Sequence, residues 1–148
     1  MPVLPIVTGA KTPVLRKKTV NVASVTKDIT KLIDDMLLTV ADAKGAGLAA
    51  PQVNRSERIC IAKIGEDFVP LINPDITWRG KETDTMEEGC LSLPDVWLQI
   101  TRPLDIILQF ETPKGKKREL KLSGFDARVV QHEVDHLDGI LIVDRVKK

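Results

Sequence analysis

The segment that most constrains this chain is residues 132–136, His-Glu-Val-Asp-His, which holds both histidines of the 148-residue sequence. Four residues advance an α-helix by about 400°, so side chains spaced by four project from the same helix face. His132 and His136 can therefore offer nitrogen ligands to one metal ion. The carboxylate of Glu133 would lie beside the open side of that ion, where it can handle the protons of a water molecule. The pattern favours a metal-dependent hydrolase over a surface helix that carries two histidines without a metal.

A catalytic ion of this kind usually has three protein ligands and one open position, so a third ligand is needed. The chain has no further histidine, which excludes the long zinc-protease pattern with three. Asp138 lies roughly 200° around the helix from His136 and would point away from the ion. Asp144 follows the apolar run 140–143 and is a weak candidate. The third ligand is therefore expected upstream, where the two cysteines are the natural choices.

The two cysteines differ in their sequence surroundings. Cys60 lies in the apolar, β-branched run 58–64, which is typical of a buried strand, so a core thiol is expected there. Cys90 lies in residues 87–94, where Gly89 permits close approach of the backbone. We favour Cys90 as the ligand, bound as a thiolate. A disulfide is the alternative, but two cysteines without a signal peptide are more typical of a reducing compartment.

Composition excludes several other classes of function. The length is that of one domain, residues 1–148, and the formal net charge of +1 indicates no nucleic acid or anionic membrane as a partner. Basic residues at 16–18 and 114–121 are expected in solvated turns and strand edges. No apolar stretch approaches the roughly 20 residues of a membrane span, and no signal peptide is recognisable. We expect a cytoplasmic protein without a membrane partner.

Hydrophobic periodicity predicts two helices among several strands. Residues 26–44 have apolar side chains at helical spacing, with Gly45 positioned to end the helix. A second helix is expected from Ser123, a plausible N-cap, to Gly139. Residues 113–116 are typical of a hairpin turn. Strands are expected at 59–64, 69–72, 97–100, 104–110, 118–122 and 140–143. The predicted fold class is α+β, with mixed or antiparallel β-sheets around a central metal-binding helix and a second amphipathic helix near the N-terminus.

Two further segments make the interpretation more specific. Residues 45–52, Gly-Ala-Gly-Leu-Ala-Ala-Pro-Gln, and residues 88–92, Glu-Gly-Cys-Leu-Ser, join residues 131–139 as a set. Together they resemble the three signature motifs of the peptide deformylases, in the family's order. Three motifs with compatible spacing are far more specific than the histidine pattern alone. The resemblance implies removal of the formyl group from the N-terminal formylmethionine of newly made polypeptides, with release of formate.

The resemblance also implies a metal site. Carried over motif by motif, Cys90, His132 and His136 would bind one divalent ion. The family favours Fe²⁺ in the cell, whereas Zn²⁺, Ni²⁺ or Co²⁺ are expected to substitute, because affinity order alone does not separate these ions at such a site.

Three more residues acquire catalytic roles from the resemblance. Glu133 would accept a proton from the attacking water and deliver it to the departing amine. Gln52, through its side-chain amide, and Leu91, through its backbone N–H, would stabilise the oxyanion of the tetrahedral intermediate.

The methionine side chain of the substrate needs an apolar pocket. Phe125 and Val129 precede His132 by seven and three residues, so they share its helix face and can line that pocket. They could equally be core residues, and Met86 is a weaker candidate.

Other residues around the motifs have two interpretations each. Gly45 and Gly47 could let the substrate backbone pair beside the loop, as could Gly89 next to Cys90, or they could serve only the turns. Glu88 and Arg102 are candidates for a pair that orients the metal ligands from behind.

Departures from the family pattern concern substrate range and docking. The loop 93–98 carries Trp97, which can shape contacts to later residues of the peptide. The sequence stops at Lys148, whereas many bacterial members continue into a C-terminal helix, so ribosome association through such a helix is not expected. A compact member from an organelle, a phage or a minimal system would look similar. The competing functions are a small metallopeptidase and a binding protein in which an ion only stabilises the fold.

Overall fold

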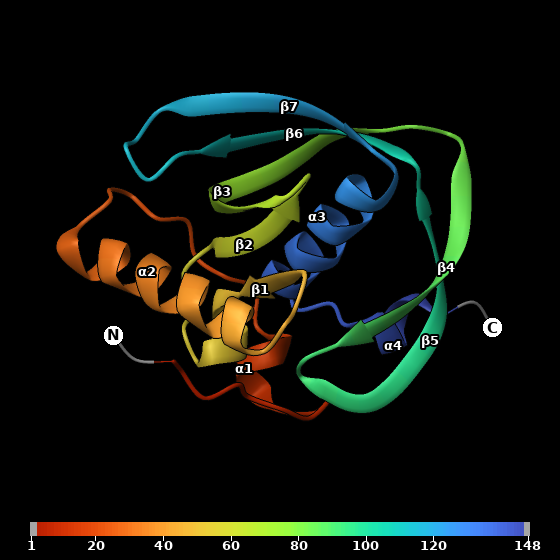
Figure 1. Cartoon of the computed structure of the whole chain (residues 1–148), viewed down its shortest axis with the longest axis horizontal. Helices are drawn as coiled ribbons and strands as arrows, with labels where there is room; N and C mark the ends of the chain where they lie inside the picture. The colour runs from red at the N-terminus through yellow and green to blue at the C-terminus, as the bar shows by residue number, and fades with distance from the viewer. Residues whose placement is uncertain (1–2, 147–148) are drawn as a thin grey trace.

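The computed structural model describes residues 3–146, in which two antiparallel sheets surround one helix (Figure 1). The larger sheet has five strands in the order β1-β2-β3-β6-β7, and β4 and β5 form a separate two-stranded ribbon. The strands are β1 (Gly47–Ala49), β2 (Ile59–Ile64), β3 (Asp67–Arg79), β4 (Thr83–Cys90), β5 (Leu93–Pro103), β6 (Asp105–Glu111) and β7 (Lys117–Ser123). The predicted α+β class with antiparallel sheets is confirmed.

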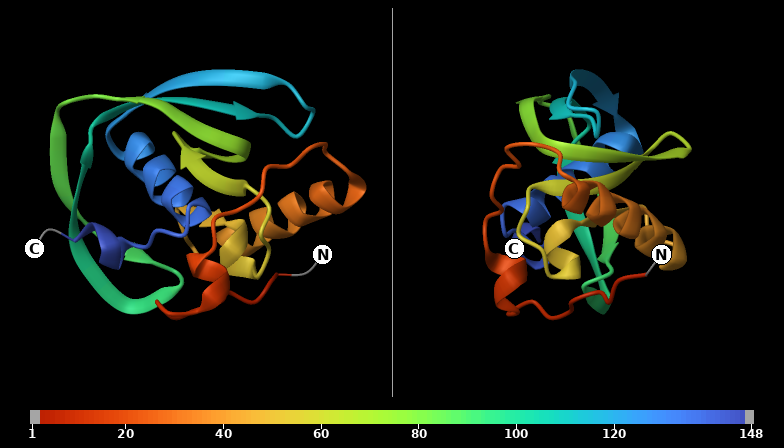
Figure 2. Two further views of the ribbon diagram at one scale, coloured as in Figure 1. Left: turned by 180° about the vertical axis from the view of Figure 1, so that it is seen from behind. Right: turned by 90° about the vertical axis from the view of Figure 1, so that its left-hand side faces the viewer.

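Helix α3 (Gly124–Leu137) lies at the centre, with the large sheet on one side and the β4–β5 ribbon on the other (Figures 1 and 2). Most of its residues are buried, including the polar Arg128, Glu133 and His136. A surface helix would not bury charged side chains, because an unpaired buried charge is costly. The alternative of a surface helix with two incidental histidines is therefore wrong.

Helix α2 (Lys27–Asp42) packs on the opposite face of strand β2. Ile59 and Ile61 of β2 pack with α2, whereas Cys60 and Ala62 pack in the cluster that contains α3. A strand covered by helices on both faces is apolar along its whole length, as the sequence of β2 is. The layers are thus α2, the sheet, α3 and the ribbon.

The predicted helix 26–44 is confirmed with small changes at its ends. Thr26 is the N-cap, and its hydroxyl accepts a hydrogen bond from the Ile29 N–H at 3.3 Å. The helix ends at Asp42 rather than at Gly45, because Lys44 already adopts the left-handed conformation with φ of 56°.

The predicted strand at 140–143 is wrong. Leu141 instead precedes the short helix α4 (Ile142–Arg145), and Leu141 and Ile142 are buried in a cluster with Leu93 and Ile100 of β5. A run of four apolar residues is compatible with a strand or with one buried helical turn, and periodicity cannot separate them.

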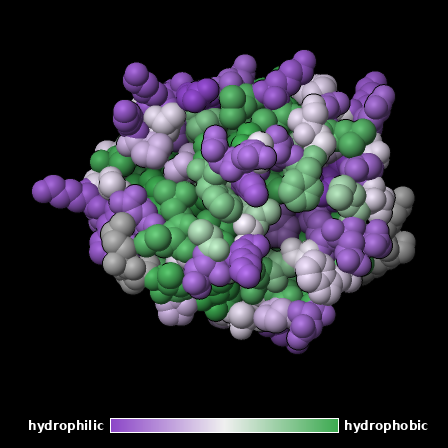
Figure 3. All heavy atoms as spheres, in the orientation of Figure 1, coloured by the Kyte–Doolittle hydropathy of each residue, from purple (hydrophilic) through white to green (hydrophobic). Residues whose placement is uncertain are grey.

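The remaining elements are short or polar. Helix α1 (Pro13–Arg16) and the 3-10 helix η1 (Ala50–Val53) lie on either side of α2 in the chain. The hairpin predicted at 113–116 is confirmed between β6 and β7. Figure 3 shows apolar side chains on the left and lower parts of one face, with polar side chains between them and along its upper edge. No helix within residues 3–146 is long and apolar enough to cross a membrane.

Candidate active site

The fold brings all three motifs to one cavity of about 560 Å³ beside α3. His132 and His136 come from α3, and Cys90 comes from the end of β4, beside a register shift between Gly89 and Cys90. One ligand atom from each of the three lies within 4.8 Å of the other two. The Cys90 Sγ is 3.2 Å from the His136 Nε2. The ribbon and the helix therefore converge on one point.

The donor set fits a divalent metal ion. A thiolate and two imidazoles are ligands that zinc and other transition metals prefer. The Nδ1 of His132 is 3.0 Å from the Glu88 Oε1, which leaves its Nε2 free to bind a metal. The Nε2 of His136 is the nitrogen beside Cys90, and its Nδ1 is buried without a hydrogen-bond partner among residues 3–146.

The other candidate ligands lie elsewhere. Cys60 is fully buried in the core strand β2, as predicted, and burial raises the pKa of its thiol. Asp138 forms an ion pair with Arg58 at 2.8 Å, and Asp144 pairs with Arg16 at 2.5 Å. Both carboxylates thus have partners away from the cavity.

Glu88 lies behind His132 and is held by several donors. Arg102 reaches its two oxygens at 2.6 and 3.0 Å, and Arg128 reaches one of them at 2.5 Å. Burial alone would raise the pKa of the Glu88 carboxyl, but the hydrogen bonds from His132 and Arg102 lower it to about 2. The predicted pairing of Glu88 with Arg102 is present in the structure. Arg128 was not predicted, although a charged residue one turn before His132 on a buried helix was a usable signal.

Glu133 is buried at the wall of the cavity. Its Oε1 has no hydrogen-bond partner within the described residues 3–146. Burial raises the pKa of the Glu133 carboxyl to about 7, against the opposing positive charges of His132 and Arg102. A bound cation would lower this pKa. A carboxylate with a free oxygen at the wall of the cavity can both take and return a proton.

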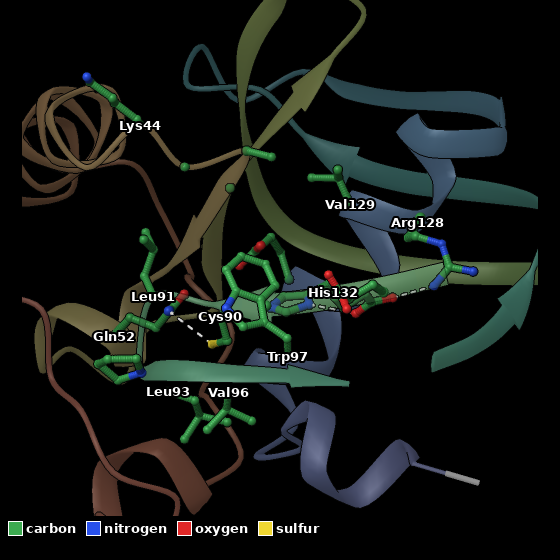
Figure 4. Close-up of a pocket in the computed structure, with 18 of the residues that line it drawn as sticks. Lys44, Gln52, Cys90, Leu91, Leu93, Val96, Trp97, Arg128, Val129 and His132 are labelled. Carbon is green, nitrogen blue, oxygen red and sulfur yellow. Dashed lines mark hydrogen bonds and ion pairs between the residues drawn. The ribbon is translucent and has the colours of Figure 1, made fainter. Parts of the chain in front are cut away.

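Gln52 comes from η1, and its side-chain amide is fixed at both ends. The carbonyl oxygen accepts from the Ala49 N–H at 2.9 Å, and the amide nitrogen donates to the Ser92 hydroxyl at 3.0 Å. The same nitrogen lies 3.8 Å from the Cys90 Sγ (Figure 4). Leu91 directly follows Cys90 and lines the cavity. Both residues predicted to stabilise the oxyanion therefore lie beside the candidate metal ligands.

The predicted pocket residues divide into two groups. Val129 is buried and Phe125 is 56% exposed, and both line the cavity. Met86 is not among the lining residues of the cavity. It lies on β4 opposite Ile100, and its side chain is 38% exposed. The structure thus gives no support to Met86 as a pocket residue.

Each of the three glycines at the cavity makes room for a side chain of this chain. A Cβ on Gly45 would lie 2.9 Å from Leu91, and one on Gly47 would lie 2.5 Å from the Glu133 carboxylate. A Cβ on Gly89 would collide with the ring of Trp97, which is 65% exposed at the cavity mouth (Figure 4). A Cβ at any of the three positions would therefore force the neighbouring side chain to move.

A buried helix with a His-Glu-x-x-His pattern, a cysteine from an adjacent ribbon and an acid–base carboxylate at one cavity define a metal-dependent hydrolase. The chain belongs to the polypeptide deformylase family, whose model matches residues 3–148. The family resemblance seen in the three motifs is thereby confirmed. Members of this family remove the N-terminal formyl group from newly synthesised polypeptides, and this chain is an enzyme of that kind.

Individual relatives agree with this assignment. The chain is 42% identical to the peptide deformylase of Thermotoga maritima over 90% of its own length and 82% of the relative's. It is 44% identical to that of Desulfitobacterium hafniense over 91% and 89% of the two chains. The crystal structure of peptide deformylase from Thermotoga maritima superposes with a TM-score of 0.96 at 38% identity, over 100% of both chains. An actinonin-bound class I type b peptide deformylase from Acinetobacter baumannii gives 0.93 at 35%, covering 99% of this chain and 100% of the other.

Proposed function

We propose that Glu133 acts as the acid–base group of formyl hydrolysis beside a metal ion held by Cys90, His132 and His136. The observation that carries this assignment is the convergence of three ligand atoms within 4.8 Å at a cavity whose wall includes Glu133. When bound, the metal supplies Lewis-acid polarisation and favours ionisation of water. The protein residues then have to move one proton and stabilise one negative charge.

Glu133 would move the proton. Water adds its hydroxyl group to the formyl carbon, and the carboxylate of Glu133 accepts the proton that is released. The C–N bond then breaks, and the same proton passes to the departing nitrogen, which leaves as a free amine while formate remains. The free Oε1 of Glu133 and the place of its side chain at the wall of the cavity support this role.

Gln52 and Leu91 would stabilise the oxyanion. The amide of Gln52 is fixed by Ala49 and Ser92, so it donates from one position without rearrangement. The backbone N–H of Leu91 is tied to Cys90 by a single peptide bond, and binding of a metal by Cys90 would fix that donor as well.

The substrate would lie between β1 and α3. Strand β1 is at the edge of the large sheet, so it can pair with an extended peptide backbone beside Gly45 and Gly47. Val129 and Phe125 supply the apolar surface on which the methionine side chain would pack. Residues 1–148 would act as one catalytic domain, which the family match over residues 3–148 supports.

The ion proposed for the cell is Fe²⁺, with Zn²⁺, Ni²⁺ and Co²⁺ as substitutes. The donor set of one sulfur and two nitrogens suits all four ions, and the family resemblance favours iron. Protein purified without oxygen should contain iron and should lose turnover in air as the thiolate is oxidised. Reconstitution of metal-free protein with each ion in turn tests this, and greater turnover with zinc than with iron would count against iron.

The formyl group itself should decide which peptides are substrates. We expect rapid release of formate from formyl-Met-Ala and no cleavage of the peptide bond in Met-Ala, because the proposed site is built around the formyl carbonyl. Formate release and free-amine appearance measure the two reactions separately. Preferential cleavage of the unformylated peptide would identify a metallopeptidase instead.

A further inference from the structure

Arg128 is a buried, charged residue whose hydrogen bonds are all made to other residues of the chain. Its side chain is 5% exposed although it lies at the wall of the cavity. One terminal nitrogen of the guanidinium donates to the Glu88 carboxylate at 2.5 Å and to the Ile100 carbonyl at 3.0 Å. The other donates to the Asp84 carbonyl at 3.0 Å and to the Asp84 carboxylate at 2.8 Å. Both terminal nitrogens are therefore occupied without a substrate.

These bonds fix one oxygen of Glu88. Oε2 accepts hydrogen bonds from Arg128 and from the Nε of Arg102. Oε1 lies within hydrogen-bond distance of His132 and accepts from the Nη2 of Arg102. With Oε2 held by two donors, the carboxylate cannot rotate about its bond without breaking strong, charge-assisted hydrogen bonds. Oε1 is thus kept at the position where His132 meets it.

Arg102 and Arg128 connect the Glu88 carboxylate to different parts of the structure. Arg102 also pairs with Asp135 at 2.9 Å, so it connects Glu88 to another side chain. Arg128 connects Glu88 to main-chain carbonyls of Asp84 in β4 and Ile100 in β5. Main-chain carbonyls in a paired ribbon have fixed positions. Arg128 therefore holds the Glu88 carboxylate in a fixed position relative to the backbone of β4 and β5.

Arg128 is also placed to act on the helix end of the same contact. It precedes His132 by four residues on α3, so the two side chains lie on one helix face. The guanidinium therefore joins the helix that carries His132 to the ribbon that carries Glu88. Arg128 thus holds Glu88 directly and belongs to the same helix as His132, the other partner of the His132–Glu88 hydrogen bond.

We propose that Arg128 is a positioning residue that holds the ligand His132 in place through Glu88. The inference rests on the proposed metal site, and it assigns Arg128 no contact with the substrate. Partners behind a metal-binding histidine typically change metal affinity or activity about 10- to 100-fold when they are removed. The substitution Arg128→Met should therefore weaken metal retention, with a smaller effect on KM for the substrate.

The experiment compares the Co²⁺-loaded full-length protein with its variants. Release of cobalt to excess EDTA is followed by loss of the visible absorption of the ion, and kcat and KM are measured on formyl-Met-Ala. Arg128→Met should release cobalt on the order of 10- to 100-fold faster than the unmodified protein. Arg128→Lys keeps the positive charge but has one terminal nitrogen instead of two. Its rate of cobalt release should lie between those of Arg128→Met and the unmodified protein.

Arg145→Met is the matched control. Arg145 belongs to the same ionic cluster and pairs with Asp135 at 2.8 Å, but it makes no bond to Glu88. This variant should release cobalt at the unmodified rate. Equal release from Arg128→Met and the unmodified protein, with both folded by circular dichroism, would overturn the proposal. A large rise in KM with unchanged cobalt release would also overturn it, because it would show a direct contact with the substrate.

If Arg128→Met does not fold, Arg128→Lys decides the matter. Lysine has one terminal nitrogen where arginine uses two separate ones for Glu88 and Asp84, so cobalt release should still be several-fold faster, and an unchanged rate would reject the role. The proposed metal site has its own test, since failure of the unmodified protein to bind cobalt would reject that site itself.

Discussion

At the scale of single residues, three glycines contribute to the shape of the cavity together with its larger side chains. Gly45, Gly47 and Gly89 were predicted to let a substrate approach, and that role stays a prediction. The structure adds a packing reason for each, because Leu91, Glu133 and Trp97 occupy the space that a Cβ would need. Sequence alone could not supply this reason, since Leu91 and Glu133 are far in the chain from Gly45 and Gly47. The contact of Gly89 with Trp97 depends on the register in which β4 pairs with β5.

Gly47 gives the sharpest test at this scale. A methyl group in Gly47→Ala would lie 2.5 Å from the Glu133 Oε2, so the carboxylate must move. Displacement of a reacting group by about 1 Å can cost on the order of a hundredfold in rate, and we expect kcat for formyl-Met-Ala to fall by that order.

Metal content should not change in this variant, because the three atoms nearest to a Cβ on Gly47 all belong to Glu133 and none to a proposed ligand. Gly80→Ala is the control, since its nearest neighbour is the Trp78 side chain at 3.2 Å, away from the cavity. Equal kcat for Gly47→Ala and the unmodified protein would show that the carboxylate position does not matter.

At the scale of elements, prediction succeeded where local physics decides the structure. The helix 26–44 was found because Thr26 caps it and apolar residues recur on one face. Strand β4 was missed because it has few apolar residues and owes its form to pairing with β5. The run 140–143 was assigned to a strand, but tertiary packing on β5 makes Ile142–Arg145 helical.

The cap of α2 should contribute measurable stability. Replacing Thr26 by alanine removes the acceptor for the Ile29 N–H, which should lower the free energy of unfolding by about 1 kcal/mol. Urea denaturation at constant metal saturation measures the change. Lys27→Ala, one residue further along, removes no cap and should have little effect. Equal stability of Thr26→Ala and the unmodified protein would mean that packing alone holds the helix.

At the scale of the whole molecule, the site exists because α3 is enclosed. The large sheet and α2 lie on one side and the β4–β5 ribbon on the other, so Gln52, Cys90 and His132 meet at one cavity. Helix geometry alone predicted that the two histidines share a face. Cys90 was favoured as their partner by excluding the other candidate ligands. The position of Gln52 was predicted only from the family resemblance, because its contact with Cys90 spans 38 residues and has no local signal.

The central claim is that Glu133 moves the proton at a site that binds its metal without it. The substitution Glu133→Ala should leave the metal content and the circular dichroism unchanged, because Cys90, His132 and His136 remain. The measurement is kcat for formate release from formyl-Met-Ala at equal metal occupancy. General acid–base groups contribute about 10²- to 10⁴-fold, so we expect a loss of that order or greater. Full turnover by the metal-loaded variant would contradict the mechanism.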